Sequence, residues 1–140
     1  VLKVDAGGGD TAITLDETDS GSVIVCAPGA NSITITLPAA GTDHVGLTYK
    51  FVIDEADDVQ SGKAITIKTA GAGADNNDDL MGTLIFIGGT SAHDVAGDTF
   101  KFPASSEKGS WAEFTCVAGG ANESWMVHAV SAGAVATVTD

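Results

Sequence analysis

The sequence has little positive charge. Its 140 residues include six lysines, no arginine and 19 acidic residues, which gives a formal net charge of −13 at pH 7. Nucleic-acid recognition requires a basic patch, and anionic membrane surfaces attract basic segments. The composition therefore argues against nucleic acid and against a membrane surface as partners. A net charge of this size keeps a protein soluble and self-repelling.

Cysteines and long apolar runs are also scarce. The two cysteines, Cys26 and Cys116, lie in apolar strand patterns and belong to no CxxC pair, which argues against redox catalysis and structural zinc. We expect buried thiols that behave as small hydrophobic groups, with a disulfide between them as the alternative. No span approaches 18 apolar residues, and no basic segment with a long apolar run opens the sequence. We therefore expect neither a transmembrane helix nor a signal peptide.

Catalytic and cofactor-binding motifs are absent as well. The sequence contains neither HExxH nor GxSxG, and Gly71–Asp75 does not open a helix that would hold a phosphate. The histidines are His44, His93 and His128, and we expect them at the surface rather than in a metal site. The sequence thus predicts no enzyme, no cofactor and no catalytic residue.

The most regular pattern spans Gly21–Asp54 and predicts three strands. Val23–Cys26 is an apolar run, and Ser32–Leu37 alternates apolar with hydroxyl side chains. Leu47–Ile53 again alternates, with its aromatic residues on the inward side. Proline and glycine occupy the intervening turns, where a reversal needs a fixed or positive φ. We predict an antiparallel β-meander for this segment.

Short alternating segments continue through the rest of the chain. Glycine, proline, asparagine or aspartate separates them, which is typical of all-β folds. We predict an antiparallel β-sandwich, or a jelly-roll or barrel-like domain, over residues 11–140, preceded by an N-terminal arm or short strand at 1–10. Further strands are expected at Thr11–Leu15, Lys63–Thr69, Leu80–Ile87, Asp98–Phe102 and Ala134–Thr139, with a closing hairpin formed by Ser110–Val117 and Ser124–Val130.

The order of these motifs carries a family resemblance over about residues 11–132. TAITLDETDSGSVIV precedes the unit ITLPAAGxxxxGLTYKFVID, which is followed by KAITIKT, SWAEFTCV and SWMVHAVSAG. This order resembles small β-rich virion proteins of tailed bacteriophages, especially capsid decoration (cement) and head-fibre proteins. The resemblance lies in packing residues and transfers no catalytic signature. The acidic loops at Asp54–Asp58 and Asp75–Asp79 depart from the family pattern.

The resemblance implies a non-enzymatic structural protein on the outer surface of the phage capsid. Such a protein binds the major capsid protein, often as a homotrimer near local three-fold axes, and stabilises the assembled shell. Leu80–Ile87 is apolar on both faces, so it is either a central strand or a subunit contact. The residues we consider as interface candidates are Leu84, Phe86, Trp111 and Trp125.

Two other functions fit parts of the sequence. The first is a fibre or tail component that contacts a host receptor. The second is a secreted carbohydrate- or calcium-binding β-sandwich, with Asp75, Asn77 and Asp79 as oxygen ligands for Ca²⁺. An EF-hand spacing is absent, so a solvated loop is the alternative for Asp75–Asp79, and likewise for Asp54–Asp58. Trp111 and Trp125 are either a sugar-stacking platform or a packed aromatic cluster.

Overall fold

The computed structural model describes residues 1–54, 59, 63–70, 79–90, 92–118 and 124–139. Regular structure in these ranges is nearly all β, with two short 3₁₀ turns, η1 (Glu17–Asp19) and η2 (Thr42–His44). None of the described helices has the length and apolar character to cross a membrane. The strands are β1 (Leu2–Asp5), β2 (Thr11–Thr14), β3 (Val23–Ala27), β4 (Ile33–Thr36), β5 (Thr48–Ile53), β6 (Ile65–Lys68), β7 (Asp79–Phe86), β8 (Ala92–Gly97), β9 (Thr99–Phe102), β10 (Trp111–Ala118), β11 (Ser124–Ser131) and β12 (Thr137–Thr139).

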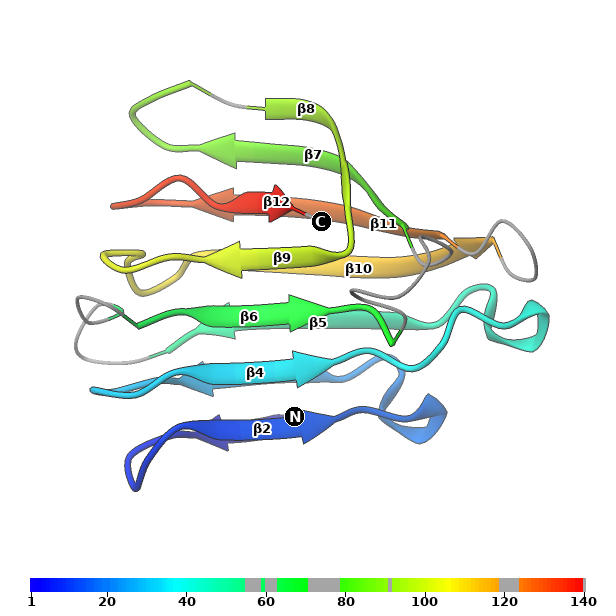
Figure 1. Cartoon of the computed structure of the whole chain (residues 1–140), viewed down its shortest axis with the longest axis horizontal. Coiled ribbons are helices and arrows are strands. Elements are labelled where there is room, and N and C mark those ends of the chain that lie inside the picture. Colours follow the sequence, from blue (N-terminus) through cyan, green and yellow to red (C-terminus); the bar gives the residue numbers. More distant parts are fainter. Residues whose placement is uncertain (55–58, 60–62, 71–78, 91, 119–123, 140) are drawn as a thin grey trace.

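The strands form two mixed sheets that lie one over the other (Figure 1). The seven-stranded sheet has the order β1-β3-β5-β10-β11-β7-β8, and the five-stranded sheet has the order β12-β9-β6-β4-β2. The all-β prediction is confirmed. The expectation of purely antiparallel strands is wrong, because β1, β3 and β5 pair in parallel, and so do β2, β4 and β6. A jelly roll, which is built from antiparallel strands, does not contain such pairs.

The first six strands alternate between the two sheets. Each of the pairs β1–β2, β3–β4 and β5–β6 contributes one strand to each sheet. We call each pair a rung, and the three rungs are stacked on one another. The predicted β-meander is therefore wrong: β3 and β4 lie in different sheets, and β3 pairs in parallel with β5. Pro28 and Gly29 form the corner between the sheets, where Gly29 has a φ of +53° and the Asn31 side chain donates to Ala6 O of the previous rung at 2.6 Å.

The remaining strands extend both sheets at the other end of the stack. β9 and β10 lie antiparallel to β6 and β5, and β12 pairs with β9. β10 and β11 form the predicted closing hairpin, which is confirmed. β7 lies parallel to β11 and antiparallel to β8, so the doubly apolar segment has strand neighbours on both sides.

One hydrophobic core lies between the sheets and fixes which side chains face outward. Phe51 and Phe114 of the seven-stranded sheet meet edge to face at 5.4 Å between ring centroids, and Phe114 meets Phe100 of the five-stranded sheet at 5.5 Å. The inward residues predicted on Ser32–Leu37 are fully buried, as are Tyr49 and Phe51. The alternating side chains of each strand must therefore lie on the two outer faces.

Candidate binding surface

A row of apolar side chains crosses the outer face of the seven-stranded sheet. The register places one outward residue of each of five neighbouring strands directly opposite the next. These residues, which we call the apolar row, are Val25 (β3), Val52 (β5), Trp111 (β10), Val130 (β11) and Ile85 (β7). Four strand spacings of about 4.8 Å give the row a length of about 19 Å.

On β7 and β11, large apolar side chains are exposed both in and outside the apolar row, and Thr83 and His128 separate the row from Met81 and Met126. Ile85 is 48% exposed, Ile87 62%, Met81 43% and Met126 38%. Met81 and Met126 are directly opposite each other in the register and lie on the same face as the row. Soluble proteins rarely expose large contiguous apolar patches, and those that occur mark interaction sites.

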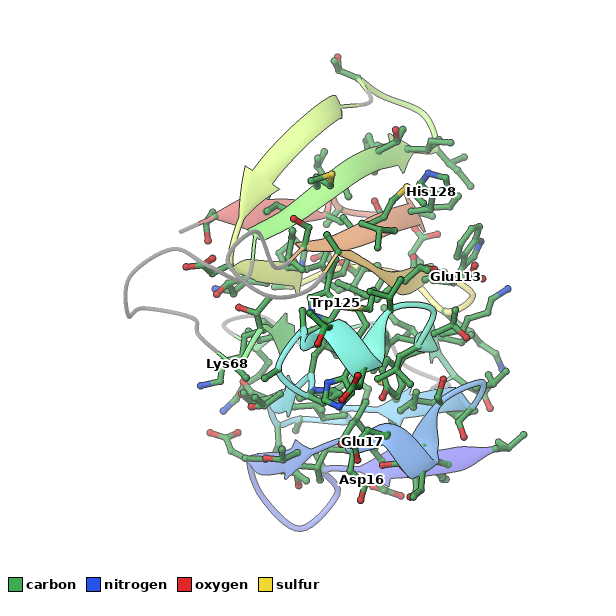
Figure 2. All side chains as sticks on the ribbon, turned by 90° about the vertical axis from the view of Figure 1, so that its right-hand side faces the viewer. Asp16, Glu17, Lys68, Glu113, Trp125 and His128 are labelled. Atoms are coloured by element: carbon green, nitrogen blue, oxygen red, sulfur yellow. The ribbon has the colours of Figure 1, made fainter. Side chains whose placement is uncertain are left out.

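A polar row runs next to the apolar row on the same face. Glu113 of β10 lies opposite Lys50 of β5 on one side and His128 of β11 on the other. Lys50 also places its ammonium 4.7 Å from the centroid of the Trp111 ring, a cation–π contact. Glu113 and His128 lie on one side of the molecule and Lys68 on the opposite side, with Trp125 between them (Figure 2). Charged groups thus border the apolar row.

The surface at the centre of this face is only shallowly hollowed. A depression of about 220 Å³ is lined by Thr83, Ile85, Trp111, His128, Ala129 and Val130. Small-molecule sites are commonly about 300–1,000 Å³. A broad and nearly flat face with a row of valine, isoleucine and tryptophan suits another protein surface better than a small ligand.

The four interface candidates occupy different places. Trp125 is fully buried against Tyr49, with 5.8 Å between ring centroids, and Leu84 is also in the core. Phe86 is half-buried at the end of β7, and Trp111 lies on the outer face in the apolar row. Because Trp111 and Trp125 lie on opposite faces of the sheet, they form neither a common sugar-stacking platform nor one aromatic cluster.

The calcium candidates fall mostly outside the described residues. This applies to Asp75 and Asn77, while Asp79 begins β7 and only its backbone is described. From the other acidic loop, Asp54–Asp58, Asp54 is described and pairs with Lys108 at 3.3 Å on the surface. Within the part of the chain that the structure describes, no three His, Cys, Asp or Glu side chains gather in a group able to hold a metal ion.

The histidines lie on three separate elements. His128 is exposed on the outer face of β11, and the backbone of His93 lies in β8. His44 Nε2 lies 3.0 Å from Glu17 Oε1, and its Nδ1 lies 2.5 Å from Ala39 O. The Ala39 carbonyl and the nearby carboxylates of Glu17 and Asp43 raise the pKa of His44. The pair with Glu17 links the turns η1 and η2.

Two buried groups have strongly raised pKa values without forming a site. Cys26 is a free thiol in the core, as predicted, and burial raises its pKa to about 12. Cys116 is likewise buried, and its Sγ donates to Ala118 O at 3.6 Å. Burial also raises the pKa of Tyr49 to about 12, and its hydroxyl donates to Asp16 O at 2.9 Å. These three side chains therefore contribute to the packing of the core.

Sequence reasoning did not bring the apolar row together. The sequence pattern indicates Trp111 by itself and Ile85 only within Leu80–Ile87, because the row depends on how β10 pairs with β5 and β11, and β11 with β7. One signal was available, since Val52, Val130 and Ile85 occupy outward positions of strands whose inward positions are already apolar.

Comparisons with protein-family models, with curated proteins and with solved structures gave no match.

Proposed function

We propose that the protein is a non-enzymatic virion protein that decorates the outer surface of a tailed-phage head. In this proposal the two sheets form a β-sandwich, and the outer face of the seven-stranded sheet binds subunits of the major capsid protein. The observation that carries the proposal is the apolar row. The resemblance of the strand motifs to phage decoration proteins supplies the identity of the partner.

The composition of the apolar row supports a protein partner. Tryptophan is enriched at protein interfaces and is among the residues that contribute most of the binding energy. Trp111 occupies the middle of the row, flanked in register by Val52 and Val130. A tryptophan flanked by aliphatic side chains on both neighbouring strands is a candidate binding hot spot.

The proposal includes assembly as a homotrimer. Ile87, which is 62% exposed just after β7 and outside the apolar row, would be covered by a neighbouring subunit. A trimer seated on a local three-fold axis contacts several capsid subunits at once. Because it binds only the assembled shell, it stabilises that shell by mass action.

Binding to purified heads tests the proposal. Heads assembled without this protein are mixed with the chain at physiological ionic strength, and bound protein is measured after sedimentation. We expect wild-type protein to saturate a fixed number of sites, and Trp111→Ala to bind about 30-fold more weakly, as for a hot spot of about 2 kcal/mol. Ile85→Asp is expected to abolish binding by placing a charge in the apolar row.

Thr66→Asp is the matched control, because it adds the same charge on the outer face of the five-stranded sheet. It should bind like wild type. Equal binding of the Ile85 and Thr66 variants would show that the apolar row is not the docking surface. Absence of wild-type binding would overturn the decoration function itself. Light scattering measures the trimer separately.

A further inference from the structure

The edge of β2 is unprotected against pairing with another strand. Natural proteins usually guard such edges with charges, proline or very short strands. β2 is the outermost strand of its sheet and consists of Thr-Ala-Ile-Thr, without charge or proline. At the same end, β1 carries Lys3 and Asp5, which pair at 3.4 Å. β12, at the far end of the five-stranded sheet, has only three residues, and Thr139 O accepts from Asp98 N.

The backbone of β2 offers hydrogen-bonding groups at this edge. Thr11 N donates to Ser32 O and Leu15 N to Thr36 O, each at 2.9 Å, so these residues turn their amides toward β4. Successive residues of a strand point their amides to opposite sides. Ala12 and Thr14 therefore direct their N–H and C=O groups away from the sheet, toward the unpaired edge.

An apolar groove opens beside this edge. The space between β1 and β2 measures about 450 Å³, and Leu2, Val4, Ile13 and Leu15 form its apolar lining. Ile13 is partly exposed, whereas the residues directly above it in the next two rungs, Ile35 and Ile67, are fully buried. Stacked repeat folds normally end in a polar capping unit. Here the terminal rung keeps an apolar inner side.

We propose that an extended segment of a partner protein, with alternating apolar and basic residues, adds to the β2 edge as a further strand. Its backbone pairs with Ala12 and Thr14, and its apolar side chains fill the groove. Charge complementarity favours a basic segment, because Asp19 lines the groove beside the Lys3–Asp5 pair and the chain carries −13 overall. Asp16 and Glu17 lie near the same end (Figure 2).

A second copy that paired through its own β2 is a poorer occupant, since it would bring a second set of the Asp16, Glu17 and Asp19 carboxylates to this end. The edge of β2 is also separate from the apolar row, which lies on the other sheet. The inference therefore stands or falls independently of the proposed capsid function.

Peptide binding tests the inference without any phage component. The probes are two capped octapeptides, one alternating valine with lysine and one alternating valine with glutamate. We expect the lysine peptide to bind at 0.15 M salt and the glutamate peptide not to bind, as measured by calorimetry. Hydrogen exchange gives a site-specific readout: the amides of Ala12 and Thr14 should exchange more slowly when the lysine peptide is present.

Two variants locate the site. Ala12→Pro removes one outward N–H but leaves the bonds from Thr11 and Leu15 to β4, and we expect about tenfold weaker peptide binding. Ala12→Ser keeps the N–H and should bind like wild type. If the proline variant does not keep the wild-type unfolding midpoint, Ile13→Lys takes its place, with Ala12→Lys on the opposite face of β2 as its control.

Three results would overturn the inference. The first is equal binding of both peptides, and the second is undiminished binding to Ala12→Pro or Ile13→Lys. The third is a concentration-dependent dimer that Ala12→Pro abolishes, in the absence of peptide binding, because it would identify a second copy as the occupant.

Discussion

The two outer faces of the molecule have similar backbones and different chemistry. On the five-stranded sheet, one cross-strand row places Ala12, Thr34, Thr66, Lys101 and Thr137 in register, and the next places Thr14, Thr36, Lys68, Thr99 and Thr139. On the seven-stranded sheet, the corresponding positions hold the apolar row. Threonine hydroxyls and two lysines thus make up these rows of one face, whereas the central row of the other face is apolar.

The difference separates the requirements of folding from those of binding. Threonine and valine are both β-branched, have nearly the same shape and are both enriched in strands. The threonine rows show that this fold forms strands without outward valine or isoleucine. Strand formation therefore does not explain why Val52, Val130 and Ile85 carry methyl groups on an outer face, whereas the proposed binding surface would.

The largest loss of stability is expected from a substitution in the core, because both sheets pack on it. Phe114 is fully buried and contacts aromatic rings of both sheets. Phe114→Ala should reduce the free energy of unfolding by about 3–5 kcal/mol, through lost burial and the remaining cavity. Denaturant unfolding measures this change. A loss below about 1 kcal/mol would mean that the two sheets do not share this core.

Gly82 sets the position of β7, which has no counterpart in the five-stranded sheet. Its φ is +151°, and a Cβ added there would lie 1.8 Å from Val127 O of the neighbouring β11. We expect Gly82→Ala to cost at least about 2 kcal/mol of stability, because strain and a backbone clash combine. Thr83→Ala on the same strand is the control. Thermal unfolding should separate the two variants clearly.

Exchanging methyl groups for hydroxyls tests the comparison of the faces directly. Val52→Thr combined with Val130→Thr converts the centre of the apolar row to the chemistry of the opposite face. We expect stability to change by less than about 0.5 kcal/mol per site, as for surface substitutions. Binding to heads should weaken by about 0.8 kcal/mol per site, or roughly 15-fold in total.

The reciprocal variant, Thr34→Val with Thr66→Val, is the control for this exchange. It adds methyl groups to the opposite face and should leave head binding unchanged. If both double variants alter head binding equally, the two faces are not functionally distinct.

The smallest effect is a pH dependence of stability, and it comes from His44, which belongs to neither outer face. The folded-state pKa of His44 is raised by the Ala39 carbonyl and by Glu17 and Asp43, so protonation favours the folded state. This contribution is fully present below the unfolded pKa of about 6.5 and is lost as pH rises through the higher folded value. Relative to His44→Gln, wild type should gain stability on acidification from pH 9 to pH 5. Unfolding midpoints across that range measure it, and a pH-independent difference would contradict it.

The local strand pattern was predictable from sequence, and the pairing was not. Alternation in Ser32–Leu37 and Leu47–Ile53 identified the buried side chains, because burial follows a period of two. The same alternation does not name the neighbouring strand. The turn at Pro28 and Gly29 predicts a reversal within one sheet, but a proline–glycine corner can equally carry the chain to the opposite sheet.

The candidate site was less predictable for the same reason. Trp111 and Trp125 open two strands of one hairpin, and sequence alone suggested that they lie together. The register pairs Trp111 with Val130 and Trp125 with Cys116, which places the two rings on opposite faces. Cross-strand pairing joins residues distant in sequence, such as Val52 and Trp111, and their contact leaves no local pattern.

The alternation of the first six strands between the sheets also has a consequence for the time course of folding. None of these strands pairs with its immediate neighbour in the chain. Between two paired strands, the chain always forms one strand of the opposite sheet. The β10–β11 hairpin, by contrast, closes over a short connection. Folding dominated by such distant pairings takes milliseconds to seconds rather than microseconds. We therefore expect the carboxy-terminal hairpin to form early, and β1 and β2, at the end of the stack, to be the last strands protected from exchange.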